Sequence, residues 1–218
     1  LMADSADFHL VGGQNVDGIS FKTNDLKAHL DFEKRIGQFQ SRDLANIVEF
    51  TDNKYIAYIN AFTWNMDNNE IVMGASGSEG NRFVSVHRRQ DSLDFIAPIA
   101  VYDVQNKTIV AKEVSHINVA DADILLNDGT IRIHQNAEME PLDSTIILIN
   151  DSPHQFKNAQ VSIEGKYSYK GSGEYDFVNG DNKTYTITFS NITFDDKNRT
   201  TIAQGTVPDD ITFNRHFA

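Results

Sequence analysis

The chain has 218 residues, 40% of them hydrophobic and including 14 Phe and 7 Tyr, which suits one large β domain or two small ones and excludes a disordered chain. The formal net charge of −12, without a cluster of Lys and Arg, excludes the basic face that a nucleic-acid-binding protein needs. The lack of cysteine excludes disulfides and thiolate sites, and no apolar run approaches the roughly 18 residues of a membrane-spanning helix.

Residues 24–39 allow two interpretations. Leu26, Leu30 and Lys34 are four residues apart, as on one face of a helix. The same stretch also alternates between apolar and polar residues, and Gly37 would weaken a helix interior. We therefore predict two strands here. A short helix is an alternative for residues 41–50.

An Asp follows an alternating apolar segment at four places, each time before a few polar residues and another apolar segment. These residues are Asp31, Asp67, Asp103 and Asp195, and the first three are evenly spaced in the sequence. The Asp side chain can accept a hydrogen bond from the backbone two residues ahead, which predicts a strand, a turn and a returning strand. Even spacing is typical of stacked repeats, so we expect successive hairpins to stack.

Two glycine-containing segments predict further hairpin turns. Asp128 and Gly129 separate the apolar residues 124–126 from the alternating residues 130–133. Gly180 lies between two other alternating segments. Glycine readily adopts the positive φ that a tight hairpin turn requires, so each segment predicts a local strand pair.

These patterns predict an all-β fold of stacked antiparallel β-hairpins, a β-solenoid or a jelly-roll-like twisted sheet, with few or no helices. The flexible segment 74–80 is the best internal boundary, separating residues 1–76 from residues 77–218. The second region would either continue the first or form a second β subdomain. Residues 212–217 still alternate at the end of the chain, which suggests a fragment of a longer protein.

Several segments resemble parts of very large uncharacterised exported proteins of Bacteroidota. They are residues 26–73, 117–122, 137–142, 170–176 and 213–218. The spacing of the Asp hairpins also resembles, more weakly, the repeat of periplasmic lipopolysaccharide-transport proteins (OstA-like). The first resemblance implies a location in the cell envelope, in the periplasm or at the outer membrane or cell surface. The second implies a twisted, V-shaped sheet with an apolar inner face, and neither implies functional residues.

Candidate ligands for a metal ion are scattered. The seven histidines lack the short spacing of known metal motifs, and we predict no metal or other cofactor. Asp121 and Asp123 would share one face of a strand and, with Asp103 or Asp128, offer oxygen ligands to a hard cation. Solvated carboxylates explain the same residues without a ligand.

Tyr167, Tyr169 and Tyr175 are the candidate ligand-binding residues. Tyr167 and Tyr169 would share one strand face beside glycine-rich turns and could form an aromatic platform for a sugar. Packing in the core is the competing interpretation, which we favour for Trp64.

The sequence carries no catalytic motif, neither a Gly-x-Ser-x-Gly elbow nor a phosphate-binding loop. We therefore predict a non-enzymatic structural or scaffold segment of a large bacterial envelope or surface protein. Its partners would be other segments of the same protein or other envelope proteins. A binding module for lipid or glycan is the first alternative. The second is a glycoside hydrolase, which would need two carboxylates facing each other across a cleft.

Overall fold

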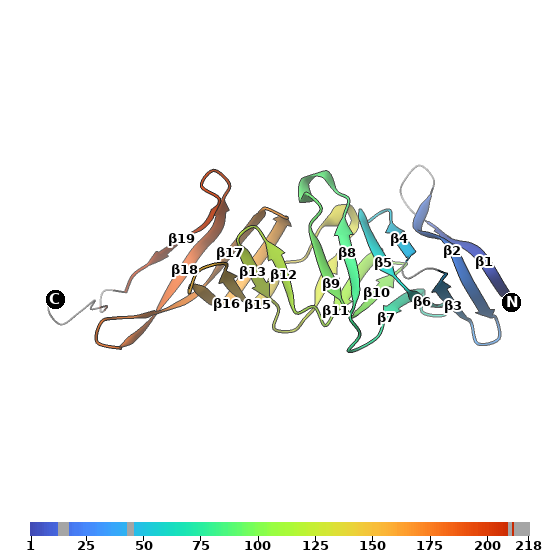
Figure 1. Ribbon diagram of the computed structural model, residues 1–218, viewed down its shortest axis with the longest axis horizontal. Coiled ribbons are helices and arrows are strands. Elements are labelled where there is room, and N and C mark those ends of the chain that lie inside the picture. The colour runs from blue at the N-terminus through green and yellow to red at the C-terminus, as the bar shows by residue number, and fades with distance from the viewer. Residues whose placement is uncertain (13–17, 43–45, 209–210, 212–218) are drawn as a thin grey trace. The chain divides into compact units, whose positions relative to one another are not determined.

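The computed structural model describes residues 1–12, 18–42, 46–208 and 211 (Figure 1). Within these residues the chain forms antiparallel strands and two single-turn 3-10 helices, η1 (Arg88–Gln90) and η2 (Gln135–Ala137). The predicted all-β fold with few or no helices is confirmed. The chain divides into two compact units: unit 1 comprises Leu1–Val114 and Asp128–Glu140, and unit 2 comprises Ser115–Asn127 and Pro141–Ala218.

Unit 1 contains one 12-stranded sheet, in which eleven strands follow the order β14-β11-β10-β7-β6-β3-β2-β4-β5-β8-β9 and β1 pairs with β2. The strands are β1 (Met2–Val11), β2 (Ile19–Asp31), β3 (Ile36–Ser41), β4 (Asn46–Phe50), β5 (Tyr55–Ile59), β6 (Ala61–Asn65), β7 (Glu70–Gly74), β8 (Asn81–Ser85), β9 (Asp94–Ala97), β10 (Ile99–Asp103), β11 (Thr108–Lys112) and β14 (Ile131–Ile133). The predicted strands within 24–39 are therefore present, whereas 46–50, part of the alternative helix, is a strand.

Strand β2 is the point at which this sheet divides into two branches. Strand β1 pairs along the length of β2, whereas β3 pairs with Leu26–Asp31 and β4 with Phe21 and Lys22. Each edge of a strand has room for one partner at a time, so β3 and β4 occupy successive parts of the edge opposite β1. Between them, Asp25 adopts a φ of 54°, and its carboxylate accepts a hydrogen bond from Arg42 at 2.9 Å. The bend at Asp25 thus directs the two branches apart.

Aromatic side chains fill the space between the two branches. Phe50 of the β4 branch lies 5.2 Å from Tyr102 of the β10 branch, centroid to centroid, and Phe21 of β2 lies within 6.0 Å of both rings. All three side chains are completely or almost completely buried. The turn between β4 and β5 adds a polar contact, because the buried Asn53 amide donates to the backbone carbonyls of Lys107 (2.7 Å) and Ile133 (3.0 Å). These contacts hold the sheet curled around its apolar face.

Unit 2 is a seven-stranded antiparallel sheet in the order β12-β13-β15-β16-β17-β18-β19. Its strands are β12 (His116–Val119), β13 (Ala122–Leu125), β15 (Leu142–Ile149), β16 (Gln155–Gly165), β17 (Ser168–Val178), β18 (Thr184–Asp195) and β19 (Thr200–Thr206). The register shifts within the β15–β16, β16–β17, β17–β18 and β18–β19 pairs. Because bulges increase bending and twist, successive shifts across neighbouring strands curl the sheet.

Two features show how tightly the sheet of unit 2 is packed where it bends. Thr145 is buried and donates its hydroxyl to the backbone carbonyl of Ala159 at 3.0 Å. A Cβ atom at Gly171 would lie 2.8 Å from the backbone oxygen of Gln160 on the neighbouring strand. The glycine in β17 is therefore required by close approach of the backbone.

Asp121, in the turn between β12 and β13, connects the two ends of this curled sheet. Its carboxylate accepts hydrogen bonds from the backbone N–H (2.7 Å) and the hydroxyl (2.6 Å) of Thr201 on β19, 80 residues away. The Thr201 hydroxyl also lies 2.6 Å from that of the buried Tyr169. Asp121 thus gives the Thr201 N–H at the edge of β19 a hydrogen-bond acceptor. It also links the turn after β12 to the last strand of the sheet.

The expected hairpin around Asp128 and Gly129 is wrong, although the local turn forms. Asp128 accepts a hydrogen bond from the Thr130 N–H, and Gly129 has a φ of 64°. However, β13 pairs with β12 and β15, whereas β14 pairs with β11. Residues 126–130 therefore pass from unit 2 to unit 1, because long-range pairing determines the partners of the flanking strands.

The flexible segment 74–80, which the sequence suggests as a boundary, begins at the end of β7 and leads into β8. Both strands belong to the sheet of unit 1, which therefore continues beyond residue 76. The contacts divide the chain at residues 114/115, 127/128 and 140/141 instead.

Replacing Asp121 by Ala should lower the protection of the β18 and β19 amides in unit 2. The substitution leaves the Thr201 N–H and hydroxyl without their acceptor, which costs about 1–3 kcal/mol. Native-state hydrogen exchange measures this loss residue by residue. Asp123→Ala is the control, because among the described residues that side chain accepts from the exposed Asn118 amide alone. Equal losses in the two variants would contradict the role assigned to Asp121.

Candidate functional site

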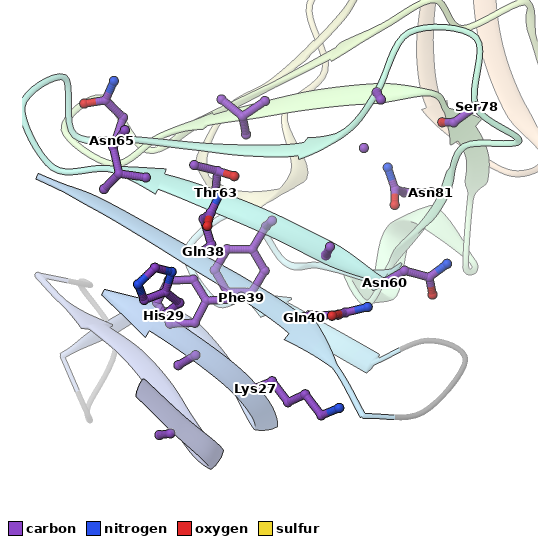
Figure 2. Close-up of a pocket in the computed structure, with 18 of the residues that line it drawn as sticks. Lys27, His29, Gln38, Phe39, Gln40, Asn60, Thr63, Asn65, Ser78 and Asn81 are labelled. Carbon is purple, nitrogen blue, oxygen red and sulfur yellow. The ribbon is translucent and has the colours of Figure 1, made fainter. Parts of the chain in front are cut away.

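An open groove of about 1170 Å³ lies in unit 1 and is the candidate site (Figure 2). Its walls come from β1, β2, β3, β6 and β7 and from the segment that leads into β8. The polar side chains of the groove lie on the sheet face opposite the aromatic core, because successive side chains of a strand point to opposite faces. In β3, for example, Phe39 is buried, whereas Gln38 and Gln40 on either side are exposed.

Strand register places the lining side chains in two rows across the sheet. The first row joins His29, Gln38, Thr63 and Val72 through successive strand pairs. The second joins Lys27, Gln40 and Ala61. Figure 2 shows the side chains of His29, Gln38 and Thr63 from this row on successive strands. Neighbouring strands lie about 4.7–4.9 Å apart, so the rows present polar groups at a regular interval.

Amide side chains dominate the polar lining of the groove. Gln38, Gln40 and Asn60 are exposed and make no hydrogen bond with their side chains inside the described part of the chain. Each amide offers both donors and acceptors to a ligand. Asn65 and Asn81 also line the groove, but their side chains hold the backbone of a turn and of β9, respectively. The first three amides are therefore the groups available for recognition.

Charged groups of both signs lie at the margins of the groove. Lys27 lines it from β2, Asp4 from β1 and Glu79 from the segment before β8. Phe39 and Phe62 also line the groove and stack on each other at 4.6 Å with an interplanar angle of 13°. The arrangement is an amide-lined surface without a concentration of one charge.

The three predicted tyrosines do not form one exposed platform. Tyr167 lies in the turn before β17 and is 43% exposed, with the Arg199 guanidinium 5.1 Å from its ring centroid. Tyr169 is only 1% exposed, and burial raises its pKa to about 12, although its hydrogen bond with Thr201 acts in the opposite direction. It is a core residue that stays neutral at physiological pH.

Tyr175 lies beyond the register shift at residues 171–173. Its hydroxyl lies 3.0 Å from His154 Nδ1, and its ring packs against Phe156 and Phe189. At the shift β17 advances by two residues and β18 by three, so the extra residue lies on β18. Tyr175 therefore keeps the core-facing side of β17 that Tyr169 has, as simple alternation predicts.

The turn aspartates are positioned by local hydrogen bonds. Asp31 accepts from the backbone N–H groups two and three residues ahead, and Asp195 does the same. Asp103 accepts from the N–H of Asn106 and from its side chain. These carboxylates organise the backbone of the turns.

Asp67 does not occupy the equivalent position. Asn65 ends β6, and its side-chain oxygen accepts from the N–H groups of Asp67 and Asn68. Asp67 lies within the turn and pairs instead with Arg35 of the neighbouring hairpin. The even spacing of Asp31, Asp67 and Asp103 therefore does not mark equivalent turn residues.

The turn at Gly180 is organised by the preceding residue. The Asn179 side chain accepts from the N–H groups of Asp181 and Lys183, and Asn182 adopts a φ of 59°. Gly180 itself is not among the described residues with positive φ. Asn can start a turn through its side-chain oxygen, so Asn179 itself was the signal in the sequence. Asn65 has the same role in the turn after β6.

The candidate carboxylate ligands are engaged by protein donors. Asp121 accepts from Thr201, and Asp123 from the Asn118 side chain. No group of three or more His, Asp or Glu side chains suited to a metal ion occurs among the residues that the structure describes.

The comparisons with known proteins give no relative. No protein-family model, curated protein or solved structure matches the chain. Over the described ranges, no helix is long and apolar enough to cross a membrane.

Asp103 should make the stability of the β10–β11 hairpin depend on pH in the acid range. Partial burial by itself raises its pKa, but the hydrogen bonds from Asn106 and Gln105 outweigh it and lower the pKa below 3.8. This contribution is present above the unfolded-state pKa and is lost as the pH falls through the folded-state pKa.

Urea unfolding of the wild type and of Asp103→Asn between about pH 2 and pH 5 measures this dependence. The variant should show a smaller fall in unfolding free energy on acidification, because an amide can still organise the turn, as Asn65 does. Asp103→Ala should be destabilised at every pH. Parallel curves for the wild type and Asp103→Asn would contradict the prediction.

Proposed function

We propose that the chain is a non-enzymatic binding module whose groove in unit 1 holds an extended, neutral, hydroxyl-rich ligand, namely a glycan chain. The supporting observation is the set of exposed amides, Gln38, Gln40 and Asn60, beside the Thr63 hydroxyl on a rigid sheet. Sugar hydroxyls both donate and accept hydrogen bonds, and so do amides, which makes the two surfaces chemically complementary.

The charges at the groove support a neutral ligand. Lys27 and His29 lie on one strand, whereas Asp4 and Glu79 supply carboxylates elsewhere in the lining. A polyanion would meet the carboxylates and a polycation the lysine, because like charges repel at short range. A neutral polymer avoids both costs and uses the amides between the charged margins.

The packing of unit 1 favours a glycan over a lipid. The apolar face of the sheet is filled by its own side chains, and Phe21, Phe50 and Tyr102 contact one another there. A lipid chain needs an apolar channel, whereas the groove exposes glutamines on the opposite face. Entry of a lipid into the core would require displacement of packed aromatic rings, at the cost of their contacts.

The scaffold role and the envelope location expected from the sequence stay predictions. The specific support for a scaffold is that each unit is built on one continuous antiparallel ladder, of 12 strands in unit 1 and seven in unit 2. A glycan-binding groove on such a segment would anchor it to a polysaccharide, so the two roles are compatible.

Affinity electrophoresis of the whole chain in gels that contain neutral polysaccharides (β-glucan, xylan or mannan) tests the proposal. At least one polymer should retard the wild type. Gln38→Ala and Gln40→Ala should each weaken binding about five- to tenfold, the effect of one lost neutral hydrogen bond. Gln155→Ala, which removes an exposed strand glutamine from unit 2, is the matched control and should bind as the wild type does.

Two results would overturn the proposal. One is the absence of retardation by every neutral polymer together with binding of a charged one. The other is retardation that both groove variants leave unchanged. A lipid that co-purifies with the chain in native mass spectrometry and survives both substitutions would favour the lipid alternative.

A further inference from the structure

The last strand of unit 2, β19 (Thr200–Thr206), forms an open edge of its sheet. It pairs with β18 along one side, and no strand pairs with its other side among the residues that the structure describes. An open edge presents unpaired N–H and C=O groups to any strand that can lie beside it. In Figure 1, β19 lies beside β18 near the C-terminal end of the described chain.

The hydrogen bond to Asp121 reveals which backbone groups face this open edge. The Thr201 N–H donates to Asp121 and is therefore directed away from β18. N–H groups of a regular strand alternate between its two sides, and each residue directs its N–H and C=O to the same side. Ala203 and Gly205 consequently direct their N–H and C=O groups to the open edge, whereas Gln204 between them faces β18.

Beyond Thr201, where the Asp121 carboxylate caps the backbone, strand β19 lacks the protection that native edge strands usually carry. Its seven residues, TTIAQGT, include no charged side chain, and Ile202 is 43% exposed. The other long edge strand, β1, contains Asp4 and Asp7. Charged side chains on an edge disfavour the addition of a strand, so β19 is the more receptive edge.

We propose that β19 pairs with β19 of a second copy of this chain, antiparallel and across a twofold axis at Gln204. In this register Ala203 of each copy faces Gly205 of the other, and their free N–H and C=O groups form four hydrogen bonds. The two Gln204 side chains lie opposite each other, where amide groups are self-complementary. The Thr201 N–H, already bound to Asp121, is not needed.

The dimer is weak and strengthens with salt. A single strand pair buries less than the roughly 1,200–2,000 Å² of a stable complex, so association depends on protein concentration. Two copies that each carry a net charge of −12 repel each other, and added salt screens this repulsion. An isologous strand pair also stops at two copies, because the β19 edge of each copy is then paired with that of the other.

Sedimentation equilibrium of the whole chain from about 10 µM to about 1 mM, at low and high salt, tests the proposal. The wild type should shift from monomer to dimer over this range. Ala203→Pro should abolish the shift, because proline removes an edge N–H without removing a bond to β18. Gln204→Glu should weaken association at least about fivefold by placing two carboxylates opposite each other. Gln155→Glu, at an exposed strand glutamine of the same unit, should behave as the wild type.

Hydrogen exchange supplies a second measurement that does not depend on the variants. The Ala203 and Gly205 amides should become more protected as the concentration of the wild type rises. A wild type that stays monomeric at the highest concentration and salt would overturn the proposal. So would a dimer that Gln204→Glu leaves unchanged, a dimer that Gln155→Glu weakens equally, or concentration-dependent protection confined to other strands.

Discussion

Both units depend on one constraint: an antiparallel sheet with one apolar face must curl until that face is buried against itself. In unit 1 the bend is at Asp25 of β2, where the branches of β3 and β4 separate. In unit 2 it follows from register shifts in four successive strand pairs. Curling costs ladder hydrogen bonds at the bulges, and burial of the aromatic and aliphatic side chains offsets that cost.

A polar contact holds the curl of each unit at a place where apolar packing alone would leave backbone groups without partners. In unit 1 the Asn53 amide donates hydrogen bonds to two backbone carbonyls, and in unit 2 the Asp121 carboxylate accepts hydrogen bonds from Thr201 of β19. Burial of unsatisfied backbone groups is costly, so these side chains do more than add contacts. The amides of Gln38, Gln40 and Asn60 do not take part in these contacts, so they are available for the ligand that we propose.

Local chemistry made part of this structure predictable from the sequence. Alternation predicts the all-β class, and the side-chain acceptors of Asp31, Asp103 and Asp195 act within three residues, so no distant information is needed. The role of Asn65 was not predicted, because the pattern was defined by aspartate alone and pointed to Asp67 in that turn. It also failed around Gly129, where the turn forms but the strands that flank it pair with distant partners.

The groove and the tyrosines show where sequence reasoning stops. Alternation indicates that Gln38 and Gln40 share a face, but only the pairing of β3 with β6 places Gln38 beside Thr63. Alternation places Tyr175 on the same face of β17 as Tyr169, but only the pairing of β17 with its neighbours places it against Phe156 and Phe189.

The nested order of the two units has a consequence for synthesis on the ribosome. Strands β12 and β13, which belong to unit 2, leave the ribosome before β14, which completes the sheet of unit 1. Until β14 is available, the β11 edge stays open and the buried Asn53 amide lacks the Ile133 carbonyl as one of its two acceptors. The N-terminal unit therefore cannot reach its final structure before the first strands of its neighbour exist, and a single cut in the gene cannot separate the two units intact.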